Sequence, residues 1–427
     1  MSSNNLSLGG AAADQAVAQK SSKLSALGPG IMVAAAAIGG SHIVASTQAG
    51  AHYGWQLVSL IILVNLFKYP FFQFGARYTA ATGESLMAGY GRMGKSWLGL
   101  FLVLNSFAAV VNIAALMGLT AALLTWVAPG VSSPVLVAAI ALISLVIILL
   151  GHYTMVDRVT KAIVVLLSVV TVLATLLALG QGPVAPADFV SPSPWTLASI
   201  GFLVALMGWM PAPIEVSAMN SVWSMSKKKE RGHLSVKDAV FDMNVGYVGT
   251  AILALFFLGM GATVLHGSGI EPAASGAAFT KQLVSMYSST IGNWSSWLII
   301  TAAICCIYSS TLTCVDGYSR TIFSAWSNLQ QRDTDETEKP LLILVVTGLA
   351  MTVVLLFPGT MLSMLNFAMI AAFLTTPVFG WLNYRLMSSE QVPEEHRPGQ
   401  WLNLWAQMGM VFLFGFAGFF IWWQWLM

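Results

Sequence analysis

Long apolar stretches alternate with short polar segments along most of the chain, after a polar stretch at residues 1–27. Most of the apolar stretches are long enough to cross about 30 Å of hydrocarbon at about 1.5 Å per helical residue. The pattern predicts an all-α integral membrane protein with a disordered cytoplasmic tail at residues 1–27. Its expected membrane spans lie near residues 28–50, 55–79, 97–127, 133–151, 158–180, 194–224, 239–265, 291–322, 340–357, 360–386 and 401–426.

The composition supports a chain that has a lipid bilayer as its main solvent. Hydrophobic residues make up 57% of the 427 residues and charged residues 8%, whereas soluble domains carry about 25% charged residues. The net charge of +2 gives no indication of a nucleic-acid partner. Cys305, Cys306 and Cys314 fall in one apolar stretch, which predicts buried thiols rather than a disulfide framework or a zinc site.

The basic residues predict how the chain crosses the membrane. With the N-terminus in the cytoplasm, seventeen of the 19 Lys and Arg residues fall on the cytoplasmic side. Lys281 falls outside, and Lys68 lies within the second span. Because positive charge is retained on the cytoplasmic side of membranes, this bias predicts a multi-pass protein of the bacterial inner membrane. The same topology places the C-terminus outside.

Two of the spans contain residues that interrupt a helix. The first span has flexible backbone and an ionisable ring at its centre, in Gly39-Gly40-Ser41-His42. The sixth span contains Pro211 and Pro213, each of which removes an amide donor and clashes with the preceding turn. Interrupted spans at matching places in two halves indicate the binding site of an inverted-repeat transporter. Two kinked helices with a packing role are the alternative.

Several ionisable residues lie within the spans, where an uncompensated charge costs at least about 2.5–3.5 kcal/mol. Glu215 closely follows the second break and is expected to be either a cation or proton site or the partner of Lys68 or His42 in an ion pair. His42 is expected to be a ligand or gate, or else a hydrogen-bonded interior side chain. Asp316 and Asp242 lie near the cytoplasmic ends of their spans, where solvated or helix-capping roles are expected.

The order and spacing of several short motifs resemble the Nramp family of divalent-metal transporters, over roughly residues 25–385. The resemblance implies the leucine-transporter fold, with two inverted five-helix repeats at residues 28–180 and 194–386, broken helices 1 and 6, and an eleventh helix at residues 401–427. The motifs that carry the resemblance are Gly28-Pro-Gly30, Gly54, Asn65, Ala76-Arg77, Thr82-Gly83, Met210-Pro211, Ser309-Ser310-Thr311 and Thr313.

The chain departs from the family in the residues that the resemblance would make metal ligands. Gly39, Gly40, Ser41 and His42 replace the Asp-Pro-Gly-Asn motif, so that the acidic ligand of the first helix is missing. The soft ligand Met210 is retained, and the backbone-carbonyl ligand would fall at Met207. In the third span, Asn112 and Ala115 replace acidic residues of the proton path, and Lys68, Asn112 and Asp316 remain candidates for coupling or ion pairing.

These observations predict a secondary transporter that moves a divalent metal cation such as manganese, iron or magnesium by alternating access. The expected metal ligands are His42, Met210 and Glu215, with backbone carbonyls of residues 38–41 and 207. The alternative is a symporter of a small organic solute, such as an amino acid or amine, held by the amides exposed at the first break. No phosphate loop or nucleophile–base pair indicates an enzyme or a resident cofactor, and no motif indicates an oligomeric state.

Overall fold

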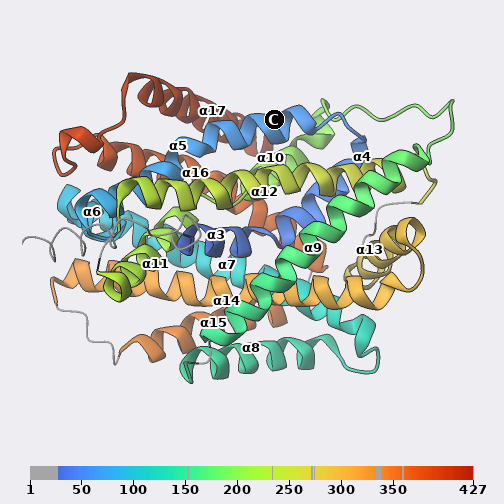
Figure 1. Cartoon of the computed structure of the whole chain (residues 1–427), viewed down its shortest axis with the longest axis horizontal. Helices are drawn as coiled ribbons and strands as arrows, with labels where there is room; N and C mark the ends of the chain where they lie inside the picture. The colour runs from blue at the N-terminus through green and yellow to red at the C-terminus, as the bar shows by residue number, and fades with distance from the viewer. Residues whose placement is uncertain are drawn as a thin grey trace, which may run out of the picture.

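The protein is an all-helical bundle in a computed structural model (Figure 1). The tail expected at residues 1–27 lies outside the described residues, except for residue 27. The structure describes residues 27–151, 153–232, 234–270, 273, 275–332, 338–357 and 360–426, but not the side chains of residues 153–161, 163 and 231.

Each of the eleven predicted spans coincides with one helix or with a broken series of helices. The first five spans correspond to α3 (Pro29–Ala37), η1 (Gly40–Ser46) and α4 (Thr47–Tyr53), followed by α5 (Val58–Thr82), α7 (Lys95–Val127), α8 (Ser133–Leu149) and α9 (Tyr153–Gln181). The next five correspond to α10 (Ile200–Trp209) and α11 (Val216–Arg231), then α12 (Val236–Val264), α14 (Ser295–Gln330), α15 (Lys339–Leu356) and α16 (Met361–Met387). The eleventh span is α17 (Gln400–Leu426).

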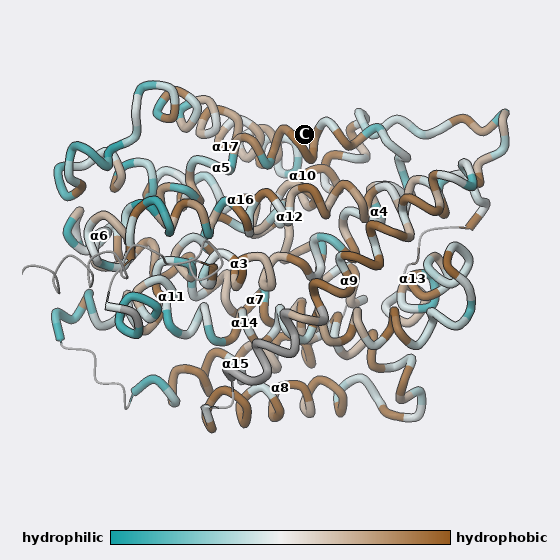
Figure 2. The backbone as a smooth tube through the Cα atoms, viewed as in Figure 1, coloured by the Kyte–Doolittle hydropathy of each residue, from teal (hydrophilic) through white to brown (hydrophobic). Residues whose placement is uncertain are grey.

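Two α-helices that hydropathy did not predict lie in the described connections. They are α6 (Leu86–Met93) and α13 (Gly276–Ile291). In the described part of the chain, nine helices, counting the interrupted first one, are long and apolar enough to cross a membrane, and Ser133–Leu149 and Leu197–Trp209 are shorter apolar helices. Apolar residues cover the middle of the long helices, whereas hydrophilic residues gather at the end of the bundle that contains α6 and α11 (Figure 2).

The broken first helix packs along α12 on both sides of its break. A Cβ atom on Gly246 would lie 2.1 Å from the carbonyl oxygen of Gly30, and one on Gly261 would lie 2.1 Å from that of Thr47. Both distances are far below van der Waals contact, so only glycine allows these backbones to touch. Small residues of this kind are the usual means of close helix packing in membranes.

Asp242 of α12 fixes the start of α3. Its carboxylate, 3% exposed, accepts hydrogen bonds from the backbone N–H groups of Gly28 and Gly30, both at 2.8 Å. These amides belong to the first turn of a helix, where N–H groups have no intrahelical partner and the helix dipole favours negative charge. Asp242 therefore has the capping role that its position in the sequence allowed.

Candidate functional site

The first break lies at Ile38 and Gly39, between α3 and η1. Gly39 has φ −152° and ψ −121°, far from helical values. The next residue, Gly40, has no room for a side chain, because a Cβ atom there would lie 2.5 Å from Cζ3 of Trp209. The glycines therefore let helix 1 approach the end of α10, which brings the two breaks together.

The carbonyl groups freed at the end of α3 have partners within the protein. The last carbonyls of a helix lack intrahelical donors, and in a membrane they must find others. Three side chains supply them: the hydroxyl of Ser310 donates to Ala35 at 2.8 Å, that of Ser41 donates to Ala37 at 2.6 Å, and the thiol of Cys306 donates to Ile38 at 2.7 Å.

His42 is fully buried, and both of its ring nitrogens are engaged. Nε2 lies 2.9 Å from the carbonyl oxygen of Thr250 in α12. Nδ1 lies 2.7 Å from the hydroxyl of Ser41 and 3.1 Å from the carbonyl oxygen of Ala37. The imidazole therefore joins η1 to α12 in this conformation, the hydrogen-bonded interior position that was one of the two expectations.

The second break separates α10 from α11 by six residues, Met210 to Glu215. Pro211 and Pro213 lie within this segment, as their lack of an amide donor and their steric demands predict. Met210 has extended backbone, with φ −96° and ψ 115°. The carbonyls of Met207 and Gly208, in the last turn of α10, are thereby left without donors from the same helix.

Lys68 of α5 supplies those donors. Its fully buried ammonium group donates to the carbonyl oxygens of Met207 at 2.6 Å, Gly208 at 2.8 Å and Ala212 at 3.3 Å. The three acceptors match the three N–H donors of a charged lysine. The ammonium also lies at the C-terminal end of α10, where the helix dipole favours a cation. Lys68 therefore stabilises the broken segment of helix 6.

A hydrogen-bonded chain crosses from the end of α10 to Glu215. Trp209 donates from Nε1 to Oδ1 of Asn112 at 3.1 Å, and Asn112 donates from Nδ2 to the hydroxyl of Tyr318 at 2.6 Å. Tyr318 then donates to Oε1 of Glu215 at 3.2 Å. All three donors point toward Glu215, so the network ends on an oxygen of its carboxyl group that acts as acceptor.

The second oxygen of that carboxylate lacks a hydrogen-bond partner among the described residues. Glu215 is 1% exposed, and its Oε2 is buried and unpaired. Glu215 makes no capping bond to α11. The first amides of α11 instead bond to the carbonyls of the preceding turn. A buried carboxyl oxygen without a hydrogen-bond donor is costly, so Oε2 is the atom of this site at which a donor or a cation would be accommodated.

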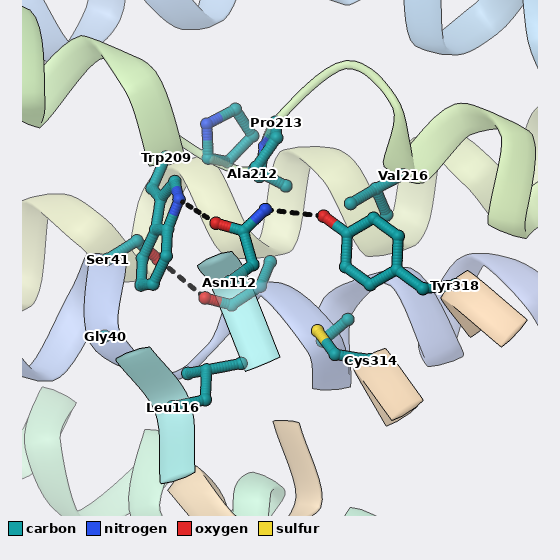
Figure 3. Close-up of a pocket in the computed structure, with 13 residues that line it drawn as sticks. Gly40, Ser41, Asn112, Leu116, Trp209, Ala212, Pro213, Val216, Cys314 and Tyr318 are labelled. Carbon is teal, nitrogen blue, oxygen red and sulfur yellow. Dashed lines mark hydrogen bonds between the residues drawn. The ribbon is translucent and has the colours of Figure 1, made fainter. Parts of the chain in front are cut away.

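A small cavity lies where the two breaks meet α7 and α14 (Figure 3). Its volume is about 30 Å³, whereas one water molecule needs roughly 10–15 Å³. The amide of Asn112 points to the hydroxyl of Tyr318, and the ring of Trp209 lies beside Ser41. The lining residues are Ala36, Ala37, Gly40, Ser41, Asn112, Leu116, Trp209, Pro211, Ala212, Pro213, Val216, Cys314 and Tyr318.

The structure brings only part of the predicted site into this cavity. Gly40, Ser41 and Asn112 line it. Gly39, His42, Met207, Met210 and Glu215 are outside the lining, although Glu215 reaches it through Tyr318. Asp316 is farther along α14, where it accepts two hydrogen bonds of 2.8 Å from Nε of Arg320 and one of 3.1 Å from Nε1 of Trp223.

Sequence reasoning did not place Tyr318 or Cys314 at the site, although Cys314 was expected to be a buried thiol. Both project from α14 into the cavity, four residues apart and therefore on one face of the helix (Figure 3). The available signal was the run of polar side chains in the second half of this span, from Ser309 to Tyr318, but it does not reveal which of them face the cavity. No group of three or more His, Cys, Asp and Glu side chains that could hold a metal occurs within the described ranges.

The fold and site thus define a polytopic helical membrane protein whose two broken helices meet at a buried polar cavity. The sequence profile of the natural resistance-associated macrophage protein-like (Nramp) family matches residues 30–423. The chain therefore belongs to the Nramp family, and it is a membrane transporter rather than an enzyme. An uncharacterized protein of Pasteurella multocida (strain Pm70) is 47% identical over 408 residues, which cover 94% of this chain and 92% of that protein.

Solved transporter structures confirm the predicted fold. A mutant of the manganese transporter from Eremococcus coleocola superposes with a TM-score of 0.66 at 16% identity, over 92% of this chain and 85% of that one. Mhp1, a nucleobase-cation-symport-1 family transporter, gives 0.57 at 13% identity, with 93% of both chains covered. MhsT, solved with L-phenylalanine, gives 0.59 at 13% identity, over 91% of this chain and 98% of that one. The fold is therefore the leucine-transporter fold with broken helices 1 and 6.

Proposed function

We propose that this protein is a secondary transporter that moves a divalent metal cation across the bacterial inner membrane by alternating access. Membership of the Nramp family supports transport of a metal. The observation that carries the proposal for this site is the unpaired Oε2 of Glu215, because a buried carboxylate beside a helix break is a ready ligand for a cation. The excess of basic residues in the predicted cytoplasmic loops supports a cytoplasmic N-terminus and an external C-terminus.

The groups around Glu215 favour a hard cation. The polar atoms within hydrogen-bond reach of its Oε1 are the hydroxyl of Tyr318 at 3.2 Å and Nδ2 of Asn112 at 3.5 Å, so the carboxylate and the Tyr318 hydroxyl are the oxygen atoms available to a metal. Oxygen ligands of this kind suit manganese or magnesium. The cavity has room for about two water molecules, so the proposed ion retains part of its hydration shell. Coordination by His42 would require its ring to leave the carbonyl of Thr250, and it remains a proposal together with that by Met210.

Flux into proteoliposomes tests the proposal. We expect the wild type to take up manganese or magnesium above the rate of empty liposomes and Glu215→Gln to lower that uptake at least 10-fold. Glu230→Gln is the matched control, because Glu230 lies exposed on the same helix α11 and should leave uptake unchanged. Uptake that is absent in the wild type, or unaltered in Glu215→Gln, would refute the proposed metal site.

A small organic solute is the second candidate, and one observation favours it. The carbonyl of Met207, which the family resemblance would assign to the metal, already accepts a hydrogen bond from Lys68. The cavity is also lined mainly by apolar and aromatic groups, including the ring of Trp209. The same proteoliposomes should therefore be supplied externally with a panel of labelled amino acids and amines. Saturable uptake of one of these without metal uptake would establish this alternative.

A further inference from the structure

The buried ammonium group of Lys68 has the surroundings of a bound cation. Its acceptors are carbonyl oxygens of helix 6, from Met207, Gly208 and Ala212, at 2.6, 2.8 and 3.3 Å. Groups of carbonyls at the ends of broken membrane helices commonly coordinate the coupling ions of transporters. Here the positive charge on these oxygens is supplied by a side chain from another helix, α5.

We propose that the three carbonyls form a monovalent-cation site that Lys68 fills permanently from within. The protein thereby carries its own cation in place of a free sodium or alkylammonium ion, and shortening Lys68 opens the site to such an ion. This inference does not depend on the cargo, because it concerns the carbonyls of α10 and the loop that follows rather than Glu215.

The geometry distinguishes this role from that of an ordinary buried lysine. All three donors are used on backbone oxygens that lie within six residues of one another along a single broken helix. Two of these oxygens belong to the last turn of α10, where the helix dipole concentrates negative potential. Without a cation the oxygens would be buried without donors in the membrane interior, which costs several kcal/mol per group. The site therefore requires a positive ion or another set of donors.

Chemical replacement of the side chain tests the proposal. Lys68→Ala removes the atoms of a propylammonium ion and leaves Cβ in place. We expect the purified variant to unfold at a lower temperature than the wild type and to regain at least half of the difference in propylammonium or sodium chloride. Tetramethylammonium has no N–H donor, and 1-propanol has no charge, so neither should stabilise the variant. The wild type should respond equally to all of these additives.

A second comparison remains informative if Lys68→Ala does not fold. Lys68→Gln retains amide donors and Lys68→Met retains a similar length without donors, so unfolding temperatures should fall in the order wild type, Gln, Met. Equal stability of the Gln and Met variants would overturn the proposal, as would a Lys68→Ala variant that no cation stabilises or that 1-propanol stabilises as well as propylammonium. Loss of metal uptake in Glu215→Gln bears only on the proposed function.

Discussion

Removal of the Asp242 carboxylate should detach the start of helix 1 from α12. The carboxylate accepts hydrogen bonds from the amides of Gly28 and Gly30, both at 2.8 Å. Hydrogen bonds to a charged group contribute about 1.5–3 kcal/mol each, so Asp242→Ala should lower the free energy of unfolding by about 3–6 kcal/mol. Asp242→Asn retains one neutral acceptor and should lose about half as much.

Equilibrium unfolding in mixed micelles with increasing SDS, followed by tryptophan fluorescence, measures this loss. Asp238→Ala is the matched control, because Asp238 lies one turn earlier on α12 and is only partly buried. Its carboxylate should contribute about 0.3–1 kcal/mol through the helix dipole. The expected order of destabilisation is Asp242→Ala, Asp242→Asn, Asp238→Ala. Equal losses at positions 242 and 238 would show that the two amide bonds do not hold helix 1.

Two further predictions concern α10 and the cavity. Gly208→Ala should destabilise the protein by at least about 1–3 kcal/mol in the same unfolding assay, because the added Cβ would lie 1.9 Å from the carbonyl oxygen of Met369. Gly201→Ala on the same helix is the control and should have little effect, because a Cβ atom there would have no neighbouring atom within 4 Å. In a variant with Cys305 and Cys306 replaced by serine, the buried, cavity-lining thiol of Cys314 should react with a small methanethiosulfonate once the proposed alternating access opens the cavity, and transported metal should slow the reaction. A Cys314 reaction rate that is insensitive to every transported species would contradict placement of the substrate in this cavity.

The sequence predicted the fold well because hydropathy is summed over whole spans. A misjudged residue changes a window of about 19 residues very little, so all eleven stretches coincide with helices. The positions of the two helix breaks could also be predicted from the sequence. Pro211 and Pro213 have no amide donors, and Gly39 lacks the Cβ that restricts the backbone of other residues. The helices α6 and α13 escaped prediction because they are short and lie in the connections.

The partners of the buried polar groups were much harder to predict. Lys68 was expected to act in coupling or in an ion pair, yet its ammonium is bound to three backbone carbonyls. Those carbonyls are freed by the break in another helix, and hydropathy does not report which backbone oxygens a break exposes. Tyr318 was not predicted as a site residue because its contact with Glu215 depends on the rotation of α14 about its axis. The composition of the span contains no information on that rotation.

Because α12 is continuous and contacts helix 1 through glycines on both sides of the first break, it holds the two segments of helix 1 in a fixed relative position. Gly246 holds the segment before the break, and Gly261 holds the segment after it, each at backbone contact. A bend at Ile38 and Gly39 therefore cannot be confined to helix 1, because one end must separate from a continuous neighbour or take that neighbour along. If the end near Gly30 separates from α12, the hydrogen bonds from the backbone amides of Gly28 and Gly30 to Asp242 must break. The Asp242 carboxylate therefore restrains that movement.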